Sequence, residues 1–140
     1  MVGLKGTIPR TIKDKPSKGK KAAKTPERAL QSAVEHYLDL RGVYFIRIPD
    51  SVYNFLYARG SVPIHIKVLI ARYLSGAPDI TALITEGGVC RALPLELKSD
   101  VGKMSEKQLE VQGQIGTVLV RDFDTAKRLI DDFIQGKPCL

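Results

Sequence analysis

The chain is poor in the residues that build disulfide frameworks, zinc sites and imidazole-based catalytic centres. Its 140 residues include two cysteines, Cys90 and Cys139, and two histidines, His36 and His65, with no metal-ligand spacing. No apolar run approaches the length of a membrane span, and the basic N-terminus lacks the apolar centre of a signal peptide. We therefore expect a soluble cytoplasmic protein with one compact domain, without a membrane segment.

Acidic residues are nearly absent from residues 1–24, which carry the whole formal charge of +7. This segment has eight basic residues against Asp14, and 8 minus 1 is +7, so residues 25–140 balance to zero. Its composition predicts a basic, flexible N-terminal arm that can bind nucleic acid phosphates without reading sequence. Lys18, Lys20 and Lys21 are the candidate contacts. A solubilising tail and a localisation signal are the alternatives.

Residues 25–140 show helix and strand signals in alternation. Thr25-Pro26-Glu27 is typical of a helix start, and the helical spacing of apolar residues continues to Gly42. Glu27 lies close to the apolar stripe of this helix and can face inward, whereas Glu35 is expected to face water. The β-branched and aromatic segment 43–48 predicts a strand. In residues 51–75 the apolar residues fit either a strand or a helix, so this insertion is left unassigned.

The C-terminal half predicts a hairpin, a helix, a strand and a final helix. Ser105-Glu106-Lys107-Gln108 matches a capping box, and a strand follows at 117–120. Asp124 or Thr125 is the expected cap of the last helix, which Gly136 ends. A helix between two strands favours a parallel crossover. The expected fold is therefore α/β, with a mixed central sheet and the order α-β-β-β-α-β-α.

The hairpin places two carboxylates together. A Gly87-Gly88 tip in a two-residue turn pairs residues whose numbers sum to 175, and 79 plus 96 is 175. Asp79 and Glu96 then stand opposite each other, with Lys98 on the same face and apolar residues on the other. Facing carboxylates repel, and a divalent cation such as Mg²⁺ offsets the repulsion with oxygen ligands. This chemistry suggests a metal-dependent nuclease, and the alternative is an exposed acidic pair on a solvated face.

These residues resemble the motifs of VRR-NUC domains, within the PD-(D/E)XK nuclease superfamily. The matching motifs are Gly76-Ala77-Pro78-Asp79, Glu96-Leu97-Lys98, the segment 102–108, and Glu27 four residues before Gln31. The resemblance covers roughly residues 25–135. The segment before Gly76 is longer than in the family pattern, and the stretch from Gln108 to Gly116 is shorter.

The resemblance implies a restriction-endonuclease-like core and an endonuclease that hydrolyses DNA with Mg²⁺ or Mn²⁺. It implies that Asp79, Glu96 and the Leu97 carbonyl hold the metal and that Glu27 completes the acidic site. Stand-alone members of similar size are associated with bacteriophages or bacteria, act as homodimers and cleave branched DNA such as Holliday junctions. A phage-encoded member would act in the host cytoplasm. Residues 51–75 are our candidate dimer surface.

The remaining site residues have two interpretations each. Lys98 can orient the attacking water or offset phosphate charge, and its alternative is a simple salt bridge. Gln108 is a capping-box member and a family-like residue that positions Lys98 or DNA. Lys103, Lys107 and Arg121 are candidate phosphate contacts beside the alternative of surface solubility. The alternative function for the whole chain is a DNA-binding module without catalysis.

Overall fold

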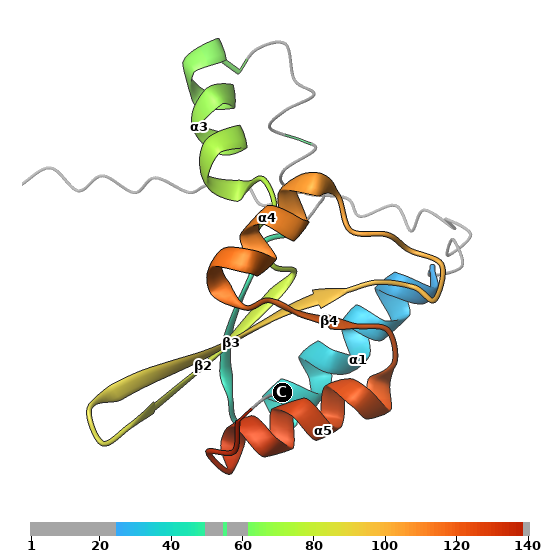
Figure 1. Cartoon of the computed structure of the whole chain (residues 1–140), viewed down its shortest axis with the longest axis vertical. Helices are drawn as coiled ribbons and strands as arrows, with labels where there is room; N and C mark the ends of the chain where they lie inside the picture. Colours follow the sequence, from blue (N-terminus) through green and yellow to red (C-terminus); the bar gives the residue numbers. More distant parts are fainter. Residues whose placement is uncertain (1–24, 50–54, 56–61, 139–140) are drawn as a thin grey trace, which may run out of the picture.

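The computed structural model describes residues 25–49, 55 and 62–138, and it is a mixed α/β fold (Figure 1). Four strands form one mixed sheet in the order β1-β2-β3-β4, and four helices surround it in the described part. This confirms the expected α/β class with a mixed central sheet. The predictions for Lys18, Lys20 and Lys21 lie outside the described residues. In the part of the chain that the structure describes, no helix has the length and apolar character needed to cross a membrane.

Helix α1 (Pro26–Leu40) and strand β1 (Tyr44–Arg47) form where the sequence predicts them. The Thr25 hydroxyl accepts a hydrogen bond from the Arg28 N–H, and Pro26 occupies the first helical position. Gly42 follows the helix with a φ of 65°, a conformation that glycine adopts without steric cost. The chain therefore turns directly from the helix into β1.

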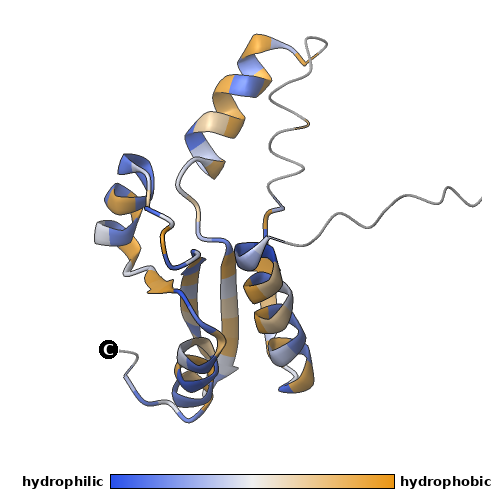
Figure 2. Cartoon of the chain, turned by 90° about the vertical axis from the view of Figure 1, so that its right-hand side faces the viewer, coloured by the Kyte–Doolittle hydropathy of each residue, from blue (hydrophilic) through white to orange (hydrophobic). Residues whose placement is uncertain are grey.

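The unassigned insertion contains helix α3 (Ile64–Leu74), while residues 50–54 and 56–61 lie outside the described part. The helix projects away from the sheet (Figures 1 and 2). Its apolar residues were compatible with either period, and the structure shows a helix. Only Ile70 of this helix is buried. Five apolar side chains of α3 are exposed: Ile64, Ile66, Val68, Leu69 and Tyr73.

Strands β2 (Ile80–Glu86) and β3 (Val89–Leu97) form the expected hairpin. The register runs from Ile80 opposite Leu95 to Glu86 opposite Val89, so the predicted sum of 175 is confirmed along this ladder. Gly87 and Gly88 at the tip have φ values of 58° and 80°, as a type I′ turn requires. Local turn chemistry therefore sets which side chains share a face.

Helix α4 (Glu106–Ile115), strand β4 (Val118–Val120) and helix α5 (Phe123–Ile134) complete the fold. Strand β4 pairs with β3 in parallel, as the intervening helix predicts. The predicted cap of α5 is wrong: Asp122 caps it instead of Asp124 or Thr125. Both Asp122 carboxylate oxygens accept hydrogen bonds from Thr125, one from its N–H and one from its hydroxyl, at 2.8 Å each. The helix therefore begins at Phe123, one residue before the earlier candidate cap.

The core lies between one face of the sheet and helices α1 and α5. The alternation of β2 and β3 turns their apolar residues toward these helices, as the hairpin register predicts. Helix α4 contributes no buried residue and lies on another side of the sheet (Figure 1). Near the end of β3, the charged residues alternate along the strand with core residues, so their side chains point to the opposite face of the sheet. The core members are Val34, Leu38, Val43, Ile80, Ala82, Leu93, Leu95, Leu97, Val120, Ala126, Leu129, Ile130 and Phe133.

Candidate active site

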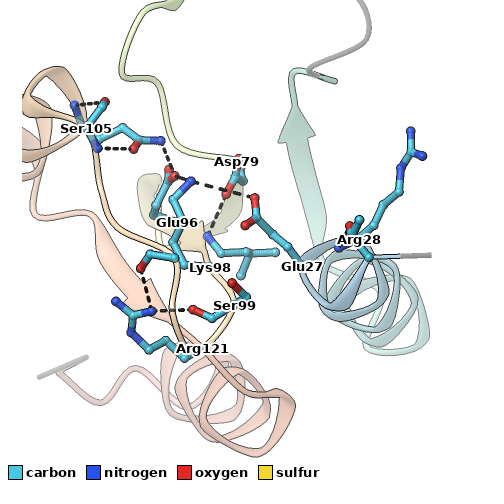
Figure 3. Close-up of polar contacts among 12 residues, drawn as sticks. Glu27, Arg28, Asp79, Glu96, Lys98, Ser99, Ser105 and Arg121 are labelled. Atoms are coloured by element: carbon cyan, nitrogen blue, oxygen red, sulfur yellow. Dashed lines mark hydrogen bonds and ion pairs between the residues drawn. The ribbon is translucent and has the colours of Figure 1, made fainter. Parts of the chain in front are cut away.

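The end of strand β3 brings together charged side chains from three parts of the chain (Figure 3). Glu96 and Lys98 come from β3 and its end, Asp79 precedes β2, and Glu27 lies in the first turn of α1. Glu96 is only 1% exposed. A buried carboxylate is costly unless it is hydrogen-bonded or paired with a cation. The alternative of an exposed acidic pair on a solvated face is therefore wrong for Glu96.

The predicted pairing of Asp79 directly opposite Glu96 lies one step beyond the end of the ladder and stays a prediction. The ladder stops at Ile80 and Leu95, and Asp79 lies in a bend before β2. Its carboxylate Oδ2 accepts a hydrogen bond from the Leu97 N–H at 2.7 Å. The charge of Asp79 raises the pKa of Glu96, so the two carboxylates lie close enough to interact.

Burial is the main electrostatic influence on Glu96. It raises the pKa of this carboxyl from 4.5 to about 7, although the hydrogen bond with Lys98 opposes the shift. The negative charges of Asp79 and Glu27 add to the increase. A carboxyl that titrates near neutral pH beside a second acid is typical of sites that do chemistry, although buried structural networks also have such shifts.

Lys98 is the cation of this cluster. Its Nζ lies 2.9 Å from Glu96 Oε1 and 3.9 Å from Glu27 Oε1. Burial alone lowers the pKa of Lys98, but the hydrogen bond and the charge of Glu96 and the charges of Glu27 and Asp79 raise it overall. The salt bridge expected as the simpler interpretation is thus present, and the ammonium remains charged between two acids.

Gln108 links the start of helix α4 to the buried carboxylate. Its Oε1 accepts from the Ser105 N–H at 2.8 Å, and the Ser105 hydroxyl accepts from the Gln108 N–H at 3.2 Å. Its Nε2 donates to Glu96 Oε1. The capping box is therefore confirmed, and the same side chain orients Glu96. Gly76 allows helix α4 to come this close, because a Cβ there would lie 2.7 Å from the Lys107 carbonyl oxygen.

A cavity of 390 Å³ adjoins Glu27 on the side of helix α1. Its lining includes Arg28 and Gln31 from α1, Arg47 from the end of β1, and Ser99 just after Lys98. Glu35 was expected to face water, and this is wrong, because its side chain is 24% exposed and its Oε1 lies 2.9 Å from Arg47 Nε. The sequence reasoning also missed Arg47. The signal was available, since Arg47 follows Val43 and Phe45 at the period of two that turns strand residues inward.

The candidate phosphate contacts have different surroundings. Lys103 is exposed, and the Lys107 ammonium pairs with Glu110 at 2.8 Å on the surface of α4. Arg121 was a candidate contact, but its Nη1 donates to the carbonyl oxygens of Ser99, Asp100 and Gly102. Figure 3 shows the Arg121 side chain beside Ser99. Arg121 therefore holds the loop that follows Lys98, and its guanidinium is used within the protein.

The donor set suits a divalent ion that prefers oxygen ligands. Asp79, Glu96 and Glu27 offer carboxylate oxygens, and buried acids of this kind gain from a nearby cation. Among the residues that the structure describes, no three His, Cys, Asp or Glu side chains stand in metal-ligand geometry. In this arrangement Lys98 supplies the positive charge between Glu96 and Glu27. Ligation by Asp79, Glu96, Glu27 and the Leu97 carbonyl stays a prediction.

Comparisons with family models, curated proteins and solved structures find no significant match to this chain.

Proposed function

We propose that this chain is a metal-dependent, structure-selective endonuclease that hydrolyses phosphodiester bonds in DNA. The observation that carries the proposal is the buried Glu96, which receives hydrogen bonds from Lys98 and Gln108 beside Asp79. An apolar side chain at this position would stabilise the fold without the cost of burying a charge. A functional role explains why a carboxylate is placed there.

In the proposed site, the carboxylates and Lys98 have different tasks. Asp79 is held by the Leu97 N–H, and Glu96 is held by Gln108, so both carboxylates are fixed before any ligand arrives. Lys98 is close enough to Glu96 to hold an attacking water beside it or to offset charge on the phosphate. When bound, Mg²⁺ or Mn²⁺ lowers the pKa of a coordinated water and neutralises phosphate charge.

The proposal includes a restriction-endonuclease-like core and the VRR-NUC resemblance. Its support is the placement of the motif residues: Asp79 lies just before β2 and Glu96 near the end of β3 in one hairpin, while Gln108 contacts Glu96 and Glu27 approaches Lys98 from separate helices. Residues at motif positions that were chosen from the sequence alone are thus neighbours in space.

Branched DNA such as a Holliday junction is the proposed substrate, and a homodimer is the proposed assembly. Resolving a junction takes two cuts at a fixed separation, so two copies of the site are needed. Helix α3 exposes five apolar side chains, which is the kind of surface that protein interfaces cover. Basic residues 1–24 are proposed to add sequence-independent attraction for DNA.

The proposal is tested by incubating plasmid and four-way-junction DNA with the protein in Mg²⁺, Mn²⁺ or EDTA. We expect metal-dependent cleavage that Glu96→Ala and Lys98→Ala abolish while junction binding stays nearly unchanged. Asp39→Asn, an exposed acid on α1, is the matched control and should cut normally. Cutting by both site variants would contradict this mechanism. Binding without cleavage under every metal would instead favour a DNA-binding module.

A further inference from the structure

The cavity beside Glu27 holds cationic side chains that the acidic site does not use. Arg28 and Arg47 come from different elements, and both line this cavity with Glu27 and Ser99. Glu27 also approaches Lys98, and Ser99 directly follows it. The cavity therefore adjoins the carboxylate cluster at Glu27, and a ligand that extends from one to the other would meet acids at one end and guanidinium groups at the other.

Arg28 has no partner that would explain its charge within the folded part. It is exposed, and its guanidinium makes no hydrogen bond or ion pair with any residue that the structure describes. Figure 3 shows its side chain leaving α1 beside Glu27 and pointing away from Glu96 and Lys98. Arg28 is thus not a counterion of the carboxylates.

Arg47 is held in place by two side chains of α1. Its Nε lies 2.9 Å from Glu35 Oε1, and with the Gln31 amide oxygen facing it, Nε and Nη2 donate to that oxygen at 2.6 and 3.1 Å. Among the described residues, Nη1 has no hydrogen-bond partner. The guanidinium is therefore held in place through Nε and Nη2, while Nη1 can donate to a ligand.

These contacts describe a pocket that suits an anion with several oxygens. Its 390 Å³ falls within the range of about 300–1,000 Å³ typical of small-ligand sites. Arginine guanidinium groups donate several N–H groups in a fixed fork that matches phosphate oxygens. Glu35 offsets the charge of Arg47, and Lys98 partly offsets that of Glu27, which leaves Arg28 as the uncompensated charge of the lining.

We propose that the pocket lined by Arg28 and Arg47 binds a phosphate of the DNA strand next to the phosphate that is cut. This inference rests on the proposed nuclease function and specifies how the substrate strand runs: past Glu27, along the end of the sheet and across helix α1. Arg28 and Arg47 contact the phosphate, and Gln31 and Glu35 position Arg47. The pocket reads no base, and it fixes the register of the strand over Glu96.

The test compares Arg28→Gln with Arg128→Gln in the full-length chain. Both variants remove one exposed arginine charge, but Arg128 lies on α5 outside the cavity lining. Binding of a fluorescent four-way junction is measured by anisotropy in EDTA across a series of salt concentrations. We expect Arg28→Gln to bind roughly threefold to tenfold more weakly, with a salt slope less negative by about 0.9, and Arg128→Gln to match the wild type.

A second measurement locates the phosphate. Neutral methylphosphonate groups replace single phosphates along the strand, and the wild type should lose affinity at one position next to the cut site. Arg28→Gln should lose less at that position than the wild type does, because only the Arg47 contact remains there. Equal affinity and salt slope for both arginine variants would overturn the proposal, as would wild-type protein that does not bind the junction.

The two proposals fail in different ways. Because binding is measured in EDTA, the phosphate pocket is judged without cleavage. Wild-type protein that cuts DNA while Arg28→Gln binds like Arg128→Gln would reject the pocket and leave the nuclease standing. Protein that never cuts, yet shows the Arg28 effect, would reject catalysis and keep the phosphate contact.

Discussion

The raised pKa of Glu96 predicts an unusual loss of stability as the pH rises. The carboxyl titrates at about 7 in the folded protein and at 4.5 in its ordinary state, chiefly because it is buried. Between these values the folded protein holds a proton that the unfolded chain releases, so the free energy of unfolding falls as pH rises through this window. At 1.36 kcal/mol per pH unit the loss is about 3 kcal/mol. With Glu96 only 1% exposed, solvent screens little of this effect.

Glu96→Gln should remove this loss. Glutamine has nearly the same shape and stays neutral at every pH, so the variant should match the wild type near pH 4.5. By pH 8 its stability should exceed that of the wild type by about 3 kcal/mol, a value that already includes the attraction of Lys98 for the ionised Glu96. The measurement is urea unfolding followed by circular dichroism at several pH values in EDTA. Glu106→Gln, an exposed acid at the start of α4, is the control and should run parallel to the wild type.

Divalent ions give the same experiment a second readout. If Glu96 must lose its proton to ligate Mg²⁺, the ion should stabilise the wild type at pH 8 much more than at pH 5. It should stabilise Glu96→Gln little at either pH. Parallel pH profiles for the wild type and Glu96→Gln in EDTA would refute the reasoning, because the buried carboxylate would then carry no desolvation cost.

Three further predictions address the surroundings of the site. Gly76→Ala should destabilise the fold by roughly 2–4 kcal/mol in urea unfolding, because its Cβ would lie 2.7 Å from a carbonyl oxygen at a φ of 77°. Gly88→Ala, at a φ of 80° in open space, should lose only about 1 kcal/mol, and equal losses would show that the close approach is unimportant. Gln108→Ala should cost about 2 kcal/mol in the same assay, since it removes the side-chain acceptor for the Ser105 N–H in the capping box and a hydrogen bond to the buried acid; an unchanged midpoint would count against the link. Val68→Asp on α3 should convert the proposed homodimer to a monomer by light scattering, while Val101→Asp, at an even more exposed apolar residue off this helix, should not. A monomeric wild-type mass would contradict the dimer.

Local chemistry made several elements predictable from the sequence. The cap at Thr25, the Gly87-Gly88 turn and the Ser105–Gln108 box each depend on residues within four positions, and all three form as expected. The wrong cap of α5 has the same local origin, because Asp122 and Asp124 both precede a helical pattern. Propensity identifies such a helix more surely than its first residue.

The conformation of α3 and the contact of Arg47 with Glu35 could not be predicted from local sequence. The apolar residues of α3 fit two periods, and only the folded chain decides between them. Glu35 was expected to face water because its own helix turns it from the apolar stripe, yet a strand distant in sequence supplies Arg47 beside it. The spacing of residues along one helix cannot predict a charged partner that another element supplies.

By itself, the sequence determined the secondary structure around the hairpin, its register, and which acids and lysine share one region. Tertiary structure decided the environment of those groups. It buried Glu96, turned Asp79 to the Leu97 N–H, and placed Lys98 between Glu96 and Glu27. The physical reason is that register follows from backbone conformation over a few residues, whereas desolvation and charge pairing depend on every element that packs against a side chain. The residue types therefore determine which chemical groups the site contains, and the fold determines their pKa values and their contacts.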